Sequence, residues 1–171
     1  VHAVDDYLRR RAHEEAGTDS LTPIGASLPS RAEAFREVTG LEIGVTEGDL
    51  TEWSVVERLF REFQPEAIVH YGEMPSAPYS MIDREHAVFT QTNNVVNTLN
   101  VLYAMAELAP DAHLVKLGTM GEYGTPNIDI EEGYIEIEHN GRKDRFLYPR
   151  QAGSLYHTTK IFDTDMLWFY V

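Results

Sequence analysis

The sequence lacks cysteine altogether. Disulfide bonds and thiolate metal ligands are therefore excluded, and we expect no metal centre. A chain without cysteine fits a reducing compartment, which suggests a cytoplasmic protein. Long apolar runs are missing as well, and none approaches the roughly 20 residues that a membrane-spanning helix needs. We therefore expect no insertion into a membrane.

Lysine is scarce and occurs only at Lys116, Lys143 and Lys160. The 28 acidic residues outnumber the 14 lysines and arginines, which gives a formal net charge of -14. This charge argues against binding to a nucleic-acid backbone, which requires a basic surface. An acidic, lysine-poor surface is typical of proteins from high-salt cytoplasm, where screening weakens self-repulsion. A halophilic host is one interpretation, and a protein that is simply acidic is the other.

Short apolar segments and helical segments alternate along most of the chain. Strands that alternate with helices at this spacing predict right-handed βαβ units and a parallel sheet, and hence an α/β fold. Pro29 and Ser30 are expected to precede the second helix, and Gly40 to end it. The expected strands are 1–5, 41–47, 67–71 and 113–117, and the expected helices are 7–16, 31–38, 49–63, 83–108 and 154–171.

Residues 129–148 break this alternation. Ile130, Tyr134, Ile135 and Ile137 precede Asn140-Gly141. Asn-Gly between alternating segments is a strong hairpin signal, because a type I′ turn needs a positive φ at both central positions. The sequence therefore predicts a β-hairpin near 130–148, inserted into the α/β core.

Tyr156 and Lys160 are four residues apart in the last expected helix. This spacing places them one above the other on the same face. A nearby ammonium favours the phenolate, so the tyrosine could act as a base near neutral pH. Taken alone the spacing is a weak signal, because it occurs by chance in many helices.

Polar residues also follow three of the expected strands. Thr119 lies in a glycine-rich segment just past the strand 113–117, at the edge where open parallel sheets bind ligands. Asp5 ends the first strand and could accept hydrogen bonds from the hydroxyls of an adenosine ribose. Asp49 follows the next strand and could accept a hydrogen bond from the adenine amino group. The alternatives are an ordinary turn at Thr119 and helix caps at the two aspartates.

The order of these signals is more specific than any one of them. The order resembles that of the extended short-chain dehydrogenase/reductases, within the NAD-dependent epimerases and dehydratases. It consists of an acid after one strand, Gly48-Asp49-Leu50 after the next, a later threonine, and Tyr-x-x-x-Lys on the following helix. Longer stretches resemble one branch, the UDP-sulfoquinovose synthases. These stretches are 4–10, 70–73, 76–84, 93–94, 117–134 and 156–160.

The resemblance implies a Rossmann-type, doubly wound parallel sheet. Residues 1–171 are then expected to be a partial NAD-binding domain with the hairpin inserted. The family's glycine-rich phosphate-binding turn and its C-terminal substrate lobe are expected to lie outside the chain. Strands 1–5 and 67–71 should flank a gap, because the family's first strand lies between them, and each should have an unpaired edge.

The resemblance also implies a reaction. Tyr156 would take the proton of the sugar 4-hydroxyl while a hydride passes to bound NAD. Lys160 would lower the Tyr156 pKa and hold the nicotinamide ribose. Thr119 would form a hydrogen bond with the 4-hydroxyl. The implied substrates are UDP-glucose and sulfite, which adds at C6, and the full-length protein is expected to be a homodimer. His157 is a candidate acid at C6, unless it is an ordinary helix histidine at the pocket wall. Cofactor contacts are expected from Asp5, Asp6, Arg9, Asp49, Leu50, Asn93, Tyr156 and Lys160, and substrate contacts from Glu73, Thr119, Met120, Glu122 and Tyr123.

Two positions bear on the exact substrate. Met74-Pro75 stands where the family usually has Gln-Arg, and that arginine is expected to help hold the nucleotide-sugar phosphates. Met120 follows Thr119 where related 4,6-dehydratases carry an aspartate, and a thioether cannot donate a proton. The alternatives are a UDP-hexose 4-epimerase or related epimerase/dehydratase, which would not use sulfite, and a non-catalytic NAD-binding remnant.

Overall fold

The computed structural model describes residues 1–19, 25–131 and 133–170. The chain divides into two compact units that interleave along the sequence. The first unit comprises Val1–Pro75 and Thr92–Lys116, and the second comprises Ser76–Gln91 and Leu117–Val171.

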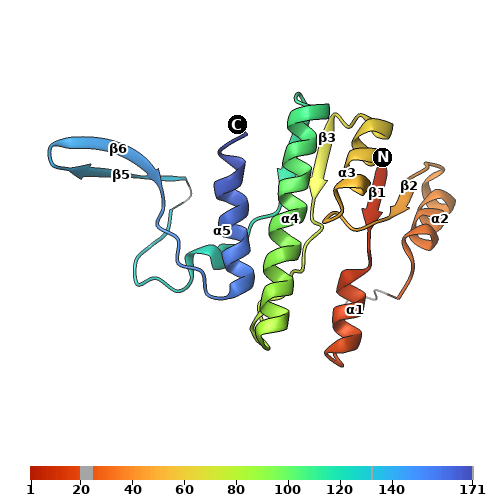
Figure 1. Cartoon of the computed structure of the whole chain (residues 1–171), viewed down its shortest axis with the longest axis horizontal. Helices are drawn as coiled ribbons and strands as arrows, with labels where there is room; N and C mark the ends of the chain where they lie inside the picture. The colour runs from red at the N-terminus through yellow and green to blue at the C-terminus, as the bar shows by residue number, and fades with distance from the viewer. Residues whose placement is uncertain (20–24, 132, 171) are drawn as a thin grey trace. The chain divides into compact units, whose positions relative to one another are not determined.

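Four parallel strands form two pairs in the first unit (Figure 1). Strand β1 (His2–Asp5) pairs with β2 (Gly44–Glu47), and β3 (Ala67–His70) pairs with β4 (His113–Lys116). The four predicted strands are therefore confirmed, although β2 begins later than expected. In the described part of the chain β1 and β3 are not paired with each other, as the expected gap between them requires.

The helices of the first unit agree with the sequence pattern except at two starts. They are α1 (Leu8–Glu15), α2 (Leu28–Thr39), α3 (Trp53–Phe63) and the C-terminal part of α4 (Arg84–Leu108). The expected start of α2 at Arg31 is wrong, because Ser27 caps the helix and Pro29 fits its first turn. Helix α3 begins at Trp53 rather than Asp49. Gly40 ends α2 with a φ of 72°, as predicted.

The apolar core of the first unit lies where α3, α4, β3 and β4 meet. Val56 and Phe60 from α3 pack with Val101 and Ala104 from α4, and Ile68 and Leu114 from the paired strands cover this cluster. Burial of a valine or phenylalanine side chain contributes about 1.5–3 kcal/mol. The core therefore fixes α4 against the β3–β4 pair and sets the position of the loop that follows β3.

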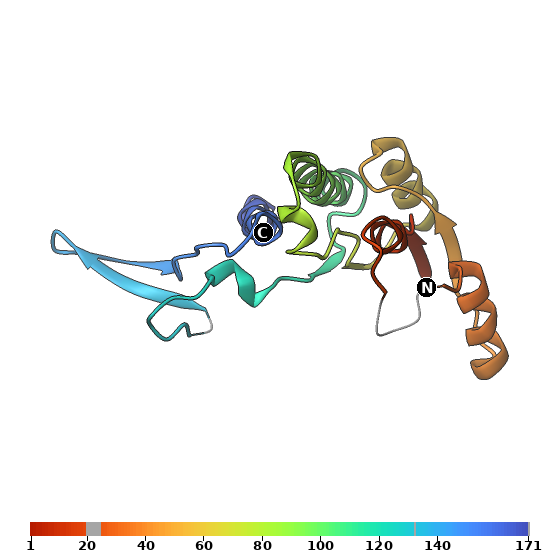
Figure 2. The ribbon, with the colours of Figure 1, turned by 90° about the horizontal axis from the view of Figure 1, so that it is seen from below.

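The second unit contains the predicted hairpin and the last helix. Figure 2 shows the two antiparallel strands, β5 (Tyr134–His139) and β6 (Arg142–Leu147). Asn140 and Gly141 have φ values of 53° and 70°, which confirms a turn with two positive φ angles. Helix α5 (Leu155–Leu167) is capped by Ser154 and ends before the expected 171. Residues 168–170 form a turn, and Val171 lies outside the described residues.

Candidate active site

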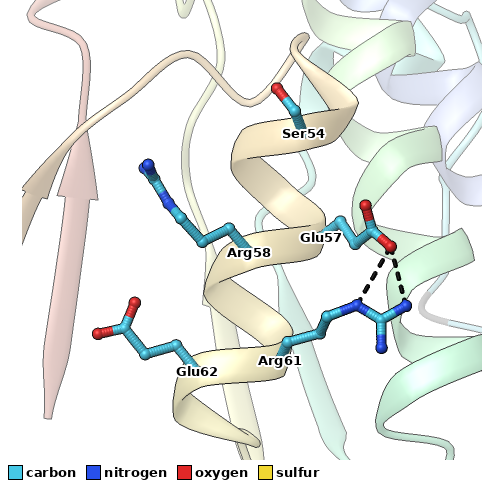
Figure 3. A pocket seen from close by; sticks show the side chains of 5 residues that line it. All are labelled: Ser54, Glu57, Arg58, Arg61 and Glu62. Atoms are coloured by element: carbon cyan, nitrogen blue, oxygen red, sulfur yellow. Dashed lines mark hydrogen bonds and ion pairs between the residues drawn. The ribbon is translucent and has the colours of Figure 1, made fainter.

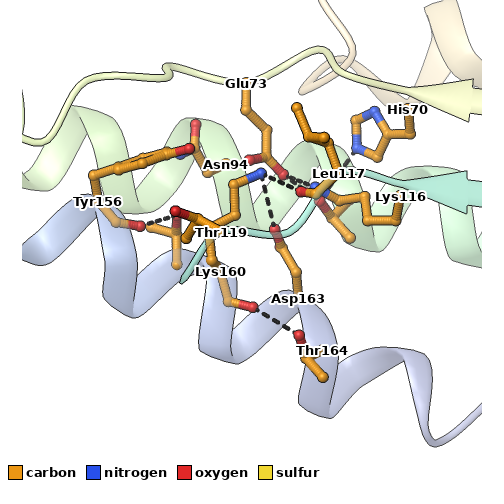
Figure 4. A network of polar contacts seen from close by, with 12 residues as sticks. His70, Glu73, Asn94, Lys116, Leu117, Thr119, Tyr156, Lys160, Asp163 and Thr164 are labelled. Carbon is orange, nitrogen blue, oxygen red and sulfur yellow. Dashed lines mark hydrogen bonds and ion pairs between the residues drawn. The ribbon is translucent and has the colours of Figure 1, made fainter. Parts of the chain in front are cut away.

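Tyr156 and Lys160 lie on the first two turns of α5, and the fold brings their side chains together. The Lys160 ammonium nitrogen is 5.8 Å from the centroid of the Tyr156 ring. The same nitrogen donates a hydrogen bond to the carbonyl oxygen of Leu117, at 2.8 Å (Figure 4). Lys160 is buried, which is rare for lysine unless it is paired. The predicted proximity of Tyr156 and Lys160 on this helix is therefore present, and a hydrogen bond holds the lysine in place.

The start of α5 is anchored on both sides of Tyr156. The Ser154 hydroxyl accepts a hydrogen bond from the His157 amide at 3.2 Å. The Tyr156 amide donates to the hydroxyl of Ser80, at 3.0 Å, and Ser80 is fully buried in the 3-10 helix η1 (Tyr79–Met81). Both bonds satisfy amide groups that a helix leaves unpaired in its first turn. They fix the position of the Tyr156 backbone.

Thr119 begins a second 3-10 helix, η2 (Met120–Tyr123), through a reciprocal cap. Its hydroxyl oxygen accepts a hydrogen bond from the Gly121 amide at 3.3 Å, and the Glu122 carboxylate accepts one from the Thr119 amide at 3.4 Å. This is the capping-box arrangement. A hydroxyl that accepts one bond still has its proton to donate, so Thr119 keeps the donor that contact with a substrate hydroxyl needs.

Glu122 joins three segments of the second unit. It is buried, the Thr164 hydroxyl of α5 donates to its carboxylate at 3.4 Å, and the Arg150 guanidinium lies 3.7 Å away. Burial raises the pKa of Glu122, while the Thr119 amide and Arg150 act in the opposite direction. These contacts give Glu122 an orienting role in η2. Its expected contact with substrate stays a prediction.

His157 is held between its own helix cap and η2. Its Nδ1 lies 3.2 Å from the Ser154 hydroxyl. A Cβ atom added to Gly121 would come within 2.3 Å of His157 Nε2, so the imidazole rests directly against the Gly121 backbone. Gly121 is therefore required by the packing of His157. We had not predicted this contact, and its only trace in the sequence is the glycine between Met120 and Glu122.

The remaining site residues of the second unit differ in exposure. Met120 is 88% exposed, whereas Tyr123 is partly buried. The structure thus places Thr119, Met120, Glu122 and Tyr123 on one short 3-10 turn and its cap. The turn contacts α5 through Glu122 and Gly121.

In the first unit, the acidic residues after β1 and β2 make local contacts. Asp5 accepts a hydrogen bond from the Tyr7 amide at 2.7 Å, and Asp6 accepts one from the Leu8 amide at 3.0 Å. Asp49 accepts bonds from the amide and the hydroxyl of Thr51. Each aspartate thus closes a local turn, and neither Asp5 nor Asp49 caps a helix, because the N-cap residues of α1 and α3 are Tyr7 and Glu52, without a side-chain cap bond. Asp5 and Asp49 lie at the same edge of the β1–β2 pair, where their proposed cofactor contacts stay predictions.

The other predicted cofactor residues of the first unit lie in one turn and on two helices. Leu50 packs against the core and accepts a hydrogen bond from the Asn100 amide group at 2.9 Å through its carbonyl. Arg9 lies on α1 and is exposed. Asn93 is buried on α4 and donates to the Asn94 side chain at 3.0 Å.

A row of buried polar residues on α4 holds the loop after β3. The Asn94 side chain accepts from the Met74 amide at 2.8 Å and donates to the Met74 carbonyl at 3.2 Å. Thr98 donates to the Glu73 carboxylate at 3.2 Å, and Lys116 forms a buried ion pair with the same carboxylate (Figure 4). Glu73 thus contacts Thr98 and Lys116 inside the first unit. Sequence reasoning missed Asn94 and Lys116 as partners of this loop.

Three further features of the described residues do not contribute to this site. No cluster of histidine and acidic residues has the arrangement of a metal site. Within the same residues, no helix is both long enough and apolar enough to cross a bilayer. An open hollow of about 430 Å³ lies along α3, lined by Ser54, Glu57, Arg58, Arg61 and Glu62 (Figure 3). It is formed by one helix face and contains no predicted site residue.

Two sequence relatives match this chain along nearly its whole length. The chain is 52% identical over 99% of its length to the chloroplastic UDP-sulfoquinovose synthase of Spinacia oleracea, of which it covers 35%. It is 46% identical over 98% of its length to UDP-sulfoquinovose synthase from Sulfolobus acidocaldarius, of which it covers 42%. The chain therefore spans less than half of each relative.

The fold is shared with an epimerase of known structure. The UDP-glucose 4-epimerase from Bifidobacterium longum, solved with NAD⁺ and UDP, matches with a TM-score of 0.66 at 21% identity. The match covers 99% of this chain and 41% of the epimerase, and it confirms the expected α/β fold class. The model of the NAD dependent epimerase/dehydratase family matches residues 3–164. The chain belongs to the NAD dependent epimerase/dehydratase family.

Proposed function

We propose that this chain is part of an NAD-dependent UDP-sulfoquinovose synthase, which converts UDP-glucose and sulfite into UDP-sulfoquinovose. The arrangement of Thr119, Tyr156 and Lys160 within one compact unit supports the oxidation at a sugar hydroxyl, and the observation that carries the synthase assignment is the sequence identity. This identity is about one half to two relatives of that name, along nearly the whole chain.

The proposed chemistry begins at the sugar 4-hydroxyl. Tyr156, as phenolate, takes the proton of this hydroxyl, and the adjacent Lys160 ammonium stabilises the phenolate. Thr119 donates a hydrogen bond to the same oxygen. Bound NAD would supply reversible hydride transfer at C4. We propose that six residues of the first unit hold the cofactor. They are Asp5, Asp6, Arg9, Asp49, Leu50 and Asn93.

The middle of the reaction requires a proton donor at C6. His157 has a suitable side chain, because a protonated imidazole can donate a proton. Its ring is held by Ser154 and by the Gly121 backbone, so its position is fixed. Met120 cannot donate a proton, and we propose that His157, which lies on α5 and packs against Gly121, is the acid. Loss of the C5 proton, acidified by the 4-ketone, together with the C6 hydroxyl would release water and leave a C5=C6 double bond. Sulfite would then add at C6 while a proton returns to C5.

The main alternative is a UDP-hexose 4-epimerase that uses the same three residues without sulfite. The observation in its favour is Met74-Pro75. Met74 is buried and both its backbone groups are bonded to Asn94, while Pro75 is exposed where the family's arginine is expected. The chain therefore lacks one expected phosphate contact.

Product analysis of the full-length protein distinguishes these assignments. NAD-loaded protein is incubated with UDP-glucose, with and without sulfite. UDP-sulfoquinovose formed only with sulfite supports the synthase. UDP-galactose formed equally in both incubations refutes the synthase and supports the epimerase. Stable NAD binding with no product in either incubation supports the non-catalytic remnant.

Three further expectations remain part of this proposal. The full-length protein is expected to be a homodimer, and size-exclusion chromatography with light scattering checks this. A cytoplasmic location is expected from the lack of cysteine. If the acidic surface reflects a halophilic host, the melting temperature should rise from low to molar salt, because screening weakens repulsion among the excess negative charges. Equal melting temperatures would contradict the halophilic interpretation.

A further inference from the structure

A buried acidic residue stands beside Lys160, and neither the sequence motifs nor the proposed reaction uses it. Asp163 follows Lys160 by three residues on α5, which places both on the same side of the helix. The Lys160 ammonium nitrogen and an Asp163 carboxylate oxygen are 3.9 Å apart, and the two side chains are only 4% and 3% exposed (Figure 4). Burial of an aspartate is costly unless a positive group compensates it.

The surroundings of Lys160 explain why it needs this partner. Desolvation disfavours the charged form of a buried lysine. The Leu117 carbonyl, at 2.8 Å, orients the ammonium but contributes only a partial negative charge. A full negative charge within about 4 Å favours the ammonium much more strongly in a low-dielectric environment. Asp163 supplies that charge from the same helix.

Two other charged side chains of the second unit, Glu122 and Arg150, have partners of their own. Glu122 is within electrostatic reach of Lys160, but its carboxylate accepts from Thr119 and Thr164 and faces Arg150. Arg150 in turn forms an ion pair with Asp165, which is exposed. At 3.9 Å the Asp163–Lys160 contact is too long for a hydrogen bond, so Asp163 acts on Lys160 mainly through its charge.

We propose that Asp163 is the counter-charge that keeps Lys160 protonated and in place, and that it is a positioning residue which acts on Tyr156 through Lys160. The proposal rests on the proposed role of Lys160 in the reaction. It goes beyond that role because it assigns the charge of the catalytic lysine to a second residue outside the Tyr-x-x-x-Lys pattern.

The test compares charge-altering variants in the full-length, NAD-loaded protein. Asp163→Asn keeps the shape of the side chain and removes its charge, whereas Asp163→Glu keeps the charge. We expect Asp163→Asn to lower kcat at least about tenfold, within the range of measured couplings between contacting charged groups. NAD content and the KM for UDP-glucose should change less than about twofold, and Asp163→Glu should recover part of the lost kcat. Asp165→Asn is the matched control on the exposed side of the same helix and should leave kcat unchanged.

The outcomes separate this proposal from the proposed function. If Lys160→Met is inactive while Asp163→Asn keeps the wild-type kcat, the positioning role is refuted and the proposed function stands. If Lys160→Met is fully active, the proposed function itself fails. A higher KM for UDP-glucose or a lower NAD content in Asp163→Asn, with unchanged kcat, also overturns the positioning role.

Thermal melting provides a readout that does not need activity, including for a variant that folds poorly. Lys160→Met removes the cation that lies 3.9 Å from the buried Asp163 carboxylate. Adding Asp163→Asn to that variant should therefore raise its melting temperature, whereas the same change in the wild type should lower it. Equal effects in both backgrounds would show that the two residues are not coupled and would overturn the proposal.

Discussion

The contact between Gly121 and His157 allows a quantitative test of the site geometry. In Gly121→Ala the new methyl carbon would lie 2.3 Å from His157 Nε2, 2.4 Å from its Cδ2 and 2.5 Å from its Cε1. Such distances are far below van der Waals contact, so either the imidazole or η2 must move. Ser154 limits the movement of the ring, because its hydroxyl lies 3.2 Å from His157 Nδ1.

The expected cost follows from overpacking in a tightly packed region. Forced displacement of this kind destabilises proteins by about 1–3 kcal/mol. We expect Gly121→Ala to lower the free energy of unfolding by this amount and to reduce kcat, because the imidazole leaves its position. In the His157→Ala background the clash is absent, so the same glycine substitution should cost much less. Gly25→Ala is the control, since nothing lies within 4 Å of the added carbon there.

Denaturant unfolding of the four variants of this cycle gives the coupling energy between the two positions. If Gly121→Ala costs the same with and without the imidazole, the contact does not exist in solution. In that case the proposed placement of His157 for C6 chemistry also loses its structural basis.

The other predictions concern individual site residues. Tyr156→Phe should abolish turnover and leave NAD binding nearly unchanged, because acid–base groups contribute on the order of 10²–10⁴-fold; retention of more than about a tenth of the rate would contradict the assignment. Lys160→Ala should impair both turnover and NAD binding, as measured by kinetics and titration. Asp5→Ala should weaken NAD⁺ binding, and a direct titration that shows a preference for NADP⁺ in the wild type would overturn the ribose contact. Burial raises the pKa of Glu122 above its usual 4.5, so this group favours folding at low pH and the benefit is lost as pH rises through the raised value. Glu122→Gln should therefore gain melting temperature relative to the wild type between about pH 4.5 and pH 7, and a pH-independent difference would refute the reasoning.

Much of the secondary structure follows from local patterns. The parallel strands could be predicted because each is a short apolar run between helical segments, and the hairpin because Asn140-Gly141 tolerates two positive φ angles. The start of α2 was misplaced because Pro29 permits two interpretations, a residue before a helix or one in its first turn. Only the contact of Ser27 with the Ser30 amide decides between them.

The sequence by itself determined the family and the identity of the chemical groups. Tyr156 and Lys160 share a helix face through their spacing alone, and Thr119 follows an apolar strand that must end near the sheet edge. These conclusions depend on helix and strand periodicity, which is a property of neighbouring residues.

Only the tertiary structure decided which groups meet across long separations in the chain. It brought Glu122 within hydrogen-bond distance of Thr164 on α5 and placed Gly121 in contact with His157. It also buried Glu73 in an ion pair with Lys116. It also buried Asp163 beside Lys160, where a helix pattern alone would allow an exposed pair. Burial and non-local contact depend on how separate elements pack, and the spacing of residues along one element contains no information about that packing.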